Sequence, residues 1–510
     1  MASTLIHGKY VVTSPKADGS DVLTDGAILE EDGFIRDVGT FEQLRQRHPE
    51  ASPLGGSGYI VLPGLVNAHH HGNGLSPLHM GIPDSSLERW IIQRIGMKAV
   101  DVYLSAAYAA IKLIQSGTTT VMLNQSLGAA SRMEEDAQAM LGAFRDAGLR
   151  VCYSLGYRQQ NRIVYADDET FLKRLPAQAA ELMRTVLKAG HLPSDDYFRF
   201  YDRLIPSLAE QRDRVRVALS PSNLQWCSDD FLREVKAYAS SGHLPIHMHL
   251  LETFYQKEYA FRTFGKSAVK HLADMQFLGP DVSIAHAVWL TEADIGIVAK
   301  SGTQVCHNAS SNLKLQSGIA PVQPLLAQGA TVALGTDSMA LNDDEDLFQD
   351  MRLVTQLHRN SGLDSTVPTA DQVLTMATVN GAQATGFEGE VGRLLPGYRA
   401  DIVLLRLDRI SQSPIDSVAG PVEALVYLAS GRDVDTVIIG GQVVVRDGRV
   451  TSLNREEVTA RLKEDASREP SVEDVRKSEI IAGVIPHIEE FYKEWGVAEM
   501  QPHYRFNTRA

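Results

Sequence analysis

Several short segments of the sequence end in histidine or an acidic residue directly after a run of apolar residues. Residues 63–72 read Pro-Gly-Leu-Val-Asn-Ala-His-His-His-Gly. Alternate residues of a strand point to the same side, so His69 and His71 can bind one metal ion together, whereas His70 should face away. A His-x-His pair by itself is also found in loops that bind nothing, so the metal interpretation needs further ligands.

A second segment supplies a further imidazole and a carboxylate. Residues 244–252 read Leu-Pro-Ile-His-Met-His-Leu-Leu-Glu, so His249 and Glu252 follow an apolar strand. A third imidazole completes a nitrogen-rich ligand set of the kind that zinc prefers, and a carboxylate beside it can move protons. His247 also fits a core histidine that is hydrogen-bonded behind the sheet.

Two more apolar runs end in groups of the same kind. One run ends at His286, in Ser-Ile-Ala-His, and the other ends at Asp337, in Val-Ala-Leu-Gly-Thr-Asp. Each pattern is common in isolation. Together the segments place four histidines and one aspartate at the ends of the first, fifth, sixth and eighth predicted strands, and in a barrel those ends converge on one mouth.

The elements that must position these groups form a regular series. Amphipathic stretches such as 134–147 and 230–240 separate most of eight apolar runs, which cover residues 59–66, 119–123, 149–155, 215–219, 244–250, 282–285, 303–306 and 331–334. Eight buried strands that alternate with helices predict an α/β fold, a (β/α)₈ TIM-like barrel. An open doubly wound sheet is the competing interpretation, but no Gly-x-Gly-x-x-Gly follows the first strand.

The two ends of the chain show a different residue pattern. Strand-and-turn patterns occupy residues 1–60 and 388–454, and we predict that they combine into one small β-sandwich domain into which the barrel, residues 61–387, is inserted. Residues 455–510 are charged and helical in pattern. They predict a helical C-terminal extension that packs on the barrel or on a neighbouring subunit.

Taken together, the sequence resembles the amidohydrolase superfamily, in the branch that contains cytosine deaminase-like, S-adenosylhomocysteine deaminase-like and triazine hydrolase-like enzymes. The resemblance covers nearly the whole chain to about residue 450. It rests on seven motifs, which lie at residues 63–71, 116–121, 249–253, 285–286, 311–321, 335–337 and 396–401.

The resemblance implies a role for each residue of the set. It implies that one divalent metal ion is held by His69, His71, His249 and Asp337. Hydroxide formed on that metal would attack an sp² carbon, with Asp337 accepting the proton of the water. Glu252 would shuttle a proton to the leaving side of the substrate, and His286 would hydrogen-bond the attacking water or the developing oxyanion. To donate, Glu252 must be protonated, so burial should raise its pKa.

The number of metal ions follows from a comparison with the same superfamily. Relatives with two metal ions carry a bridging carboxylated lysine on the fourth strand. Here residues 214–220 read Arg-Val-Arg-Val-Ala-Leu-Ser and contain no lysine. A mononuclear site is therefore expected, with Zn²⁺ as the first expectation and Fe²⁺ or another transition metal as the alternative.

The loops after the strands should bind the substrate. Side-chain amides can both donate and accept, which suits a ring that carries N and C=O groups, and tryptophans can stack on a planar substrate. The predicted substrate-binding residues are Trp90, Asn124, Tyr157, Gln159, Gln160 and Trp226. The same residue types also cap loops or fill cores. Asn124 and the sequence Asn308-Ala309-Ser310 depart from the superfamily pattern, which leaves the substrate open.

Three functional hypotheses follow. The leading one is an aminohydrolase, that is, a deaminase of a purine, pyrimidine or triazine type of nitrogen heterocycle. The first alternative is hydrolysis of an amide, urea or (thio)carbamate bond, as in the phenylurea and molinate hydrolases that this branch also resembles. The second alternative is an inactive scaffold relative, which would have lost ligands that this sequence retains.

Composition and charge indicate which binding partners and which cellular location to expect. The 510-residue chain has a formal net charge of −14, which disfavours nucleic acid and anionic membranes and leaves a small-molecule substrate as the expected partner. Its three cysteines indicate no disulfide framework, and its N-terminus has no signal-peptide pattern, so a cytoplasmic location is expected. By analogy with the superfamily, we expect a homo-oligomer, either a dimer or a tetramer.

Overall fold

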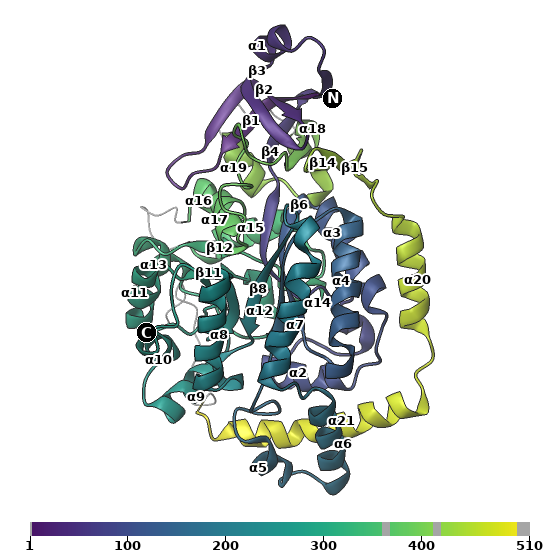
Figure 1. The fold of residues 1–510 in the computed structure, drawn as a ribbon, viewed down its shortest axis with the longest axis vertical. Coiled ribbons are helices and arrows are strands. Elements are labelled where there is room, and N and C mark those ends of the chain that lie inside the picture. Colours follow the sequence, from purple (N-terminus) through teal and green to yellow (C-terminus); the bar gives the residue numbers. More distant parts are fainter. Residues whose placement is uncertain (1–2, 360–367, 412–419, 497–510) are drawn as a thin grey trace.

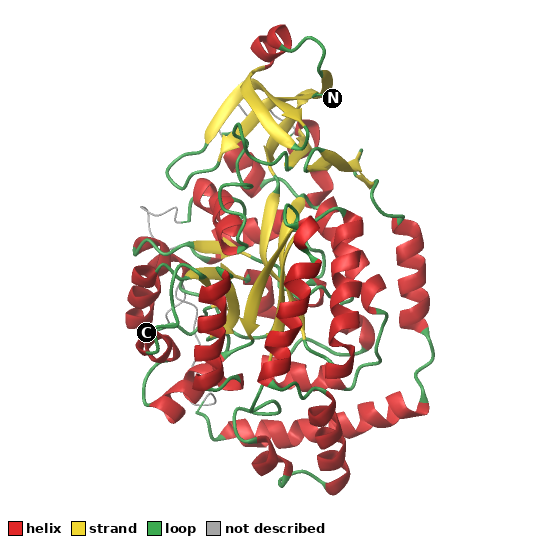
Figure 2. Ribbon diagram, viewed as in Figure 1, coloured by secondary structure: helices red, strands yellow, loops and turns green. Residues whose placement is uncertain are grey.

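Two eight-stranded sheets organise the protein, which is represented by a computed structural model describing residues 3–359, 368–411 and 420–496. One sheet forms a barrel in the middle of the molecule, and the other forms a smaller module at one end (Figure 1, Figure 2). Helices surround the barrel sheet, and two further helices continue from the module, one along the side of the barrel and one across its far end.

The barrel confirms the predicted fold class. Its strands are all parallel, and each pairs with the next one along the chain. A single parallel bridge between His70 and Asp337 brings the last strand segment back to the first. The strands are β5 (Leu65–His70), β6 (Thr118–Ser126), β7 (Arg150–Tyr157), β8 (Val215–Pro221), β9 (Ile246–Leu250), β10 (Val282–His286), β11 (Gln304–His307) and β12 (Val332–Leu334).

Helices follow every barrel strand. From β5 to β9 the connections contain α2 (Leu87–Ile95), α3 (Val102–Gln115), α4 (Met133–Ala147), α5 (Asp168–Leu172), α6 (Ala177–Ala189), α7 (Ser194–Ser207) and α8 (Asp229–Gly242). From β9 onward they contain α9 (Phe254–Phe264), α10 (Ala268–Asp274), α11 (Glu292–Ser301), α12 (Ala309–Lys314), α13 (Val322–Ala327), α14 (Met339–Asn342), α15 (Leu347–Leu357), α16 (Ala370–Met376) and α17 (Val379–Ala384).

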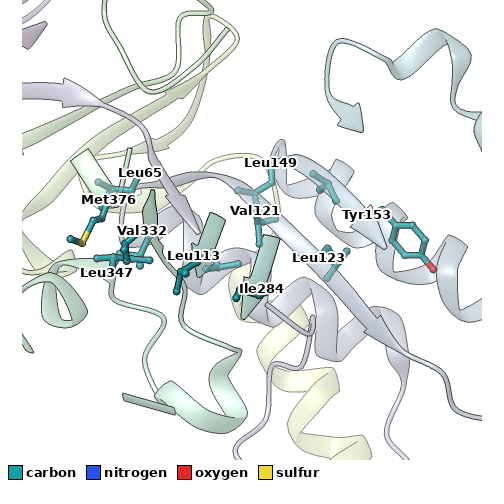
Figure 3. Close-up of a cluster of buried hydrophobic side chains, with 14 of the residues drawn as sticks. Leu65, Leu113, Val121, Leu123, Leu149, Tyr153, Ile284, Val332, Leu347 and Met376 are labelled. Atoms are coloured by element: carbon teal, nitrogen blue, oxygen red, sulfur yellow. The ribbon is translucent and has the colours of Figure 1, made fainter. Parts of the chain in front are cut away.

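Burial on both faces explains why the barrel strands are nearly continuous apolar runs. Outward-facing side chains such as Val121 and Leu123 of β6 join one large core with the covering helices, for example with Leu113 of α3 (Figure 3). A separate buried cluster that includes Val66, Met122 and Phe387 lies apart from this outer core. The two groups follow the two-residue period of the strands.

The smaller module is built from both ends of the chain, as predicted. Its strands form one mixed sheet in the order β16-β15-β14-β13-β4-β1-β2-β3. They are β1 (Thr4–Ser14), β2 (Asp21–Glu31), β3 (Phe34–Thr40), β4 (Ser52–Pro63), β13 (Ile402–Arg406), β14 (Val434–Ile439), β15 (Gln442–Arg446) and β16 (Arg449–Val450), with the short helices α1 (Phe41–Arg47), α18 (Leu407–Ile410) and α19 (Pro421–Tyr427). The exact domain boundaries stay a prediction.

The structure divides one predicted strand in two. The apolar run 59–66 contains the end of β4 and the start of β5, with Gly64 between them. A side chain at Gly64 would collide with Thr119, because its Cβ would lie 2.1 Å from the Thr119 hydroxyl oxygen. The chain therefore passes from the module into the barrel at a residue that must be small.

The described part of the C-terminal extension is helical, as expected. Helix α20 (Arg455–Ser467) packs on α3, and α21 (Val472–Lys493) crosses α2 and α6 at the end of the barrel opposite the module (Figure 1). Residues 497–510 of the predicted extension lie outside the described residues. No helix in the described ranges is both long and apolar enough to cross a bilayer. All three cysteines are buried and free.

A buried ion pair links the two sheets. Arg150, the first residue of β7, donates to both carboxylate oxygens of Asp401 at 2.6 and 3.0 Å, and each side chain is only 1% exposed. The same carboxylate accepts the backbone N–H of Gly440 at 2.8 Å. Each of the two charges is therefore stabilised by the other, because solvent does not reach the site.

We predict that Asp401→Asn lowers the free energy of unfolding by about 3–5 kcal/mol, because the substitution leaves Arg150 charged and buried without its counter-ion. Urea denaturation followed by circular dichroism measures the loss. The matched control is Asp408→Asn, which removes the partner of Arg406 from an exposed pair and should cost about 0–1 kcal/mol. Equal effects of the two substitutions would contradict the role of the pair.

Candidate active site

Side chains from four barrel strands converge at the carboxyl-terminal end of the barrel. Oδ1 of Asp337 lies 3.2 Å from Nε2 of His69 and 3.2 Å from Nε2 of His71. Nε2 of His249 lies 3.2 Å from Nε2 of His71, and Nε2 of His286 lies 3.8 Å from a carboxylate oxygen of both Glu252 and Asp337. The segments that were singled out in the sequence therefore meet in one cluster.

The side chains on one side of the cluster are fully buried, and those on the other side are partly exposed. The side chains of His69, His286 and Asp337 are at most 2% exposed, whereas the side chain of His71 is 14% exposed and His249 is 9% exposed. A substrate can therefore approach from the side on which His71 and His249 lie.

The donor set fits a metal ion. Nε2 of His69, Nε2 of His286 and Oδ1 of Asp337 are fully buried and have no hydrogen-bond partner among the described residues. Buried polar atoms without partners are costly unless something else satisfies them. Three overlapping groups from this cluster have ligand atoms close enough to share one ion, and His69, His286 and Asp337 each belong to two of them.

A chain of hydrogen bonds fixes the tautomer of His69. Nδ1 of His69 lies 2.7 Å from Nε2 of His247, and Nδ1 of His247 lies 2.7 Å from the Ser283 hydroxyl. That hydroxyl in turn donates to the Ile246 carbonyl at 3.4 Å, so it accepts from His247. The protons therefore run from His69 to His247 to Ser283, and Nε2 of His69 is left with its lone pair.

The other two imidazoles are held by main-chain carbonyls. Nδ1 of His71 donates to the Asn124 carbonyl at 2.7 Å, and Nδ1 of His249 donates to the Ser222 carbonyl at 2.9 Å. A carbonyl can only accept, so Nε2 of each ring is unprotonated in the neutral form. Burial also lowers the pKa of His69 and of His249 well below the usual range, which favours neutral rings.

Asp337 is held as a carboxylate. Burial alone would raise its pKa, but pairing with His69, His71 and His286 in their protonated forms holds the pKa well below the usual range. When these rings are neutral, the Ser311 hydroxyl is still a donor to the carboxylate. Its Oδ2 accepts the Ser311 hydroxyl at 2.6 Å, which leaves Oδ1 to face the imidazoles. Its backbone has a φ of 65°, in the left-handed region that costs a non-glycine residue about 1–3 kcal/mol.

Glu252 and His286 form the other half of the cluster. Glu252 is 3% exposed, and burial, with the nearby charges of Asp337 and Glu88, raises its pKa well above the usual range. Its carboxyl group is therefore protonated over a wider pH range than an exposed glutamate. His286 donates from Nδ1 to the Asn312 side-chain oxygen at 2.9 Å, so its Nε2 is directed at the two carboxyl groups without a proton.

His70 does not join the cluster, in line with its predicted orientation. Its Nε2 lies 2.8 Å from Oε1 of Glu345, whose other oxygen accepts the Thr336 hydroxyl at 2.6 Å. Glu345 thus ties the neighbours of His69 and of Asp337 together. Sequence reasoning missed Glu345 and assigned no role to Ser311 or Asn312, although these two residues begin the motif at 311–321, because all three lie in helical or loop segments that show no strand-end pattern.

The comparisons with known proteins agree with this geometry. Residues 60–444 match the Amidohydrolase family. The chain belongs to the amidohydrolase family. It is 34% identical over 466 residues to 5'-deoxyadenosine deaminase of Methanothermobacter thermautotrophicus, which covers 90% of this chain and 98% of that protein. It is 30% identical over 469 residues to 5-methylthioadenosine/S-adenosylhomocysteine deaminase of Acetivibrio thermocellus, which covers 91% and 99%.

Solved structures share the fold. An adenosine deaminase from Xanthomonas campestris with bound zinc superposes with a TM-score of 0.76 at 24% identity, over 92% of this chain and 98% of that chain. An atrazine chlorohydrolase from Arthrobacter aurescens in complex with zinc superposes with a TM-score of 0.77 at 24% identity, over 91% and 100%. The predicted membership of the family and the predicted barrel are thus confirmed.

Three of the predicted substrate-binding residues of this amidohydrolase lie near the mouth of the barrel. Trp90 of α2 packs with Leu315 and Leu341, which follow β11 and β12. Trp226 ends the short 3-10 helix (Leu224–Trp226) that follows β8 and is 4% exposed. Asn124 holds His71 through its carbonyl, and its buried side-chain amide has no partner in the described ranges.

The other three are directed elsewhere. Tyr157 donates its hydroxyl to the Leu192 carbonyl at 2.8 Å and packs on Phe231, because the alternation along β7 turns it toward the helices. Gln159 is exposed, and its side-chain oxygen accepts the Ser228 N–H at 3.2 Å. Gln160 contacts backbone carbonyls next to Trp226 at 3.5 Å. The structure does not bring Tyr157 or Gln159 to the cluster.

A cleft of about 740 Å³ at the opposite end of the barrel is a separate feature. Its lining includes Arg216, Arg399 and Glu390, and both arginines pair with that glutamate. None of the converging histidines or carboxylates lines it. The cleft lies between the barrel and the β module and does not contain the candidate active site.

We predict that His247→Phe weakens metal binding by about 10- to 100-fold, because His69 loses the partner that fixes its tautomer and its orientation. Competition with a chelator of known affinity measures the change. Ser283→Ala removes only the next link of the chain, so its effect should be smaller. An unchanged metal affinity in His247→Phe would rule out a supporting role for this residue.

Proposed function

We propose that the chain is a metal-dependent aminohydrolase that removes an amino group from a nitrogen heterocycle. The observation that carries the proposal is the convergence of three unprotonated imidazole nitrogens and one carboxylate beside a buried glutamic acid whose pKa is raised. The names of the curated relatives support deamination as the reaction.

One divalent ion, with zinc as the first choice, would be held by His69, His71, His249 and Asp337. When bound, it would act as a Lewis acid that lowers the pKa of water toward about 7. The zinc in the superposed structures supports the choice of metal. The fourth strand bears Ala218 and Ser220 where a second ion would need a bridging ligand, so we propose a mononuclear centre.

The residues of this chain then divide the proton transfers. Asp337, held as a carboxylate, accepts a proton from the attacking water. His286 presents an unprotonated Nε2 between Glu252 and Asp337 and orients that water or accepts a hydrogen bond from it. Glu252, held in its protonated form, donates to the nitrogen of the heterocycle and so makes the ring carbon a better electrophile. The proton that Asp337 accepted then passes to the amino group, which leaves as ammonia when the C–N bond breaks, and the hydroxyl proton of the adduct returns to Glu252 as the carbonyl forms.

The test combines metal analysis with a substrate panel. The purified protein is stripped with a chelator, reloaded with Zn²⁺ and assayed for ammonia release. The panel contains 5'-deoxyadenosine, 5'-methylthioadenosine, S-adenosylhomocysteine, aminopyrimidines and aminotriazines, with aryl ureas and thiocarbamates as the competing class. Metal-dependent ammonia release from a heterocycle supports the proposal. Release of an amine from ureas or carbamates alone would replace it with the amide-type alternative, and no turnover would favour an inactive scaffold.

Location and assembly are separate proposals. We propose a cytoplasmic protein that forms a dimer or a tetramer, and light scattering on the purified chain checks the second point.

We predict that His249→Ala loses the bound metal and the activity together, because His249 supplies one of three imidazole ligands. Inductively coupled plasma mass spectrometry gives the metal content per chain, alongside the rate of ammonia release. The control is His191→Ala, which changes an exposed histidine outside the cluster and should keep both. Full metal occupancy in His249→Ala would exclude this residue as a ligand.

We predict that Glu252→Gln retains the metal but lowers kcat by about 100- to 10,000-fold, because an amide cannot transfer the proton. Metal content and steady-state kinetics are measured on the same preparation. Glu258→Gln, which alters a glutamate on the helix that follows, is the matched control and should behave like the wild type. Near-normal turnover in Glu252→Gln would remove Glu252 from the reaction.

A further inference from the structure

Two arginines stand at the rim of the candidate active site. Arg158 directly follows β7, where Cys152, Ser154 and Gly156 alternate with the outward-facing Tyr153, Leu155 and Tyr157. The same alternation turns Arg158 to the inner side of the strand. Arg94 lies on α2, which belongs to the connection after β5. Both side chains are half-buried.

Each guanidinium is stacked on a buried tryptophan. The Arg158 guanidinium carbon lies 3.7 Å from the centroid of the Trp226 ring, and that of Arg94 lies 4.7 Å from the centroid of the Trp90 ring. The Trp226 carbonyl accepts the N–H groups of Gln159 and Gln160 at 2.8 and 3.1 Å, which fixes the loop that carries Arg158. Stacking covers one face of a guanidinium and leaves its N–H edge available.

Neither guanidinium has a counter-ion among the described residues. In the part of the chain that the structure describes, neither forms an ion pair or a side-chain hydrogen bond. By contrast, the buried Arg150 is matched by two bonds to Asp401. The chain has 63 acidic and 49 basic residues, so a shortage of carboxylates does not explain the two unpaired cations.

The two arginines share one electrostatic environment with the catalytic cluster. Burial lowers the pKa of Arg158 to about 10, and the positive charge of Arg94 also lowers it. Burial also lowers the pKa of Arg94, which interacts with the charge of Asp337. Direct contacts also join the two segments that carry these arginines: the Tyr165 ring packs on Trp226 with centroids 6.2 Å apart, and the Tyr165 hydroxyl donates to Glu88 of α2 at 2.9 Å. Two cations on neighbouring segments, without a counter-ion among the described residues, have a free-energy cost that a bound anion would offset.

We propose that Arg94 and Arg158, with Trp90 and Trp226 behind them, form an oxyanion-binding subsite, so that the substrate carries a carboxylate or phosphate substituent in addition to the reacting ring. This inference rests on the proposed function for the reacting ring only. The subsite holds the anionic end of the substrate while the ring lies over His71 and His249. A planar guanidinium can form two parallel bonds to either type of oxyanion.

Direct binding tests the subsite without turnover. Isothermal titration calorimetry on the metal-loaded Glu252→Gln protein measures benzoate and phenyl phosphate, with benzamide as the neutral comparison. We expect Arg94→Gln and Arg158→Gln, each added to this background, to weaken benzoate or phenyl phosphate by about 10- to 100-fold. Benzamide should change by less than about twofold. The tighter of the two anions identifies the oxyanion as a carboxylate or as a phosphate.

Two further variants test whether a loss of anion binding comes from the missing guanidinium or from a misfolded protein. Arg158→Lys keeps the charge but loses the fork, so its affinity should fall between those of the wild type and Arg158→Gln. Arg262→Gln removes an arginine that also stacks on a tryptophan, Trp495, but is paired with Glu258, and should leave anion binding unchanged. Anion affinities that are the same in the wild type, Arg94→Gln and Arg158→Gln would overturn the subsite.

The outcomes for the subsite and for the reaction are distinct. Arginine-dependent anion binding without ammonia release from any heterocycle leaves the subsite and contradicts the proposed function. Deamination of neutral heterocycles as fast as of their carboxylated analogues, with kcat/KM unaffected by either arginine substitution, keeps the function and contradicts the subsite.

Discussion

In the closed barrel the last strand segment returns to the first, and the backbone N–H of Asp337 donates to the carbonyl of His69 at 3.0 Å. This contact is where the barrel closes, since His70 and Asp337 form the single parallel bridge between β5 and the segment after β12. It also brings Oδ1 of Asp337 within 3.2 Å of two imidazoles. The left-handed backbone at Asp337 and Ser338 is tolerated here because closure, Glu345 and Ser311 fix the segment from several directions.

The direction of the surrounding hydrogen bonds also helps to bring the proposed ligand atoms together. Each of the three histidines proposed as ligands has its Nδ1 engaged, by His247 or by a backbone carbonyl, so each presents Nε2 to the same point. Those partners lie on β6, on β9 and at the residue that directly follows β8, so the strands that build the barrel also set the tautomers. Rings that could turn or exchange tautomers would present a poorer ligand set.

The site is arranged so that stability and chemistry lie at opposite ends of the barrel. The amino-terminal end is covered by the β module and joined to it by the buried pair of Arg150 and Asp401. There a buried arginine is fully matched. At the mouth the half-buried Arg94 and Arg158 are stacked on tryptophans but have no counter-ion in the described ranges, and the carboxyl group of Glu252 is held protonated by burial. Arginine side chains are thus paired with a carboxylate where they stabilise the fold, and lack such a partner among the described residues where a ligand can bind.

The sequence alone determined the barrel and the polar residues at the ends of its strands, because both follow from local patterns. Buried parallel strands are apolar runs, and His69, His71, His249, His286 and Asp337 stand where those runs end. Only the tertiary structure decided how these groups meet and what supports them. The roles of Ser311, Asn312 and Glu345 depend on contacts between segments far apart in the chain. Near the ends of strands, a one-residue shift reverses the face of a side chain. For this reason Tyr157 lies among the helices while its neighbour Arg158 stacks on Trp226, a difference that local pattern could not resolve.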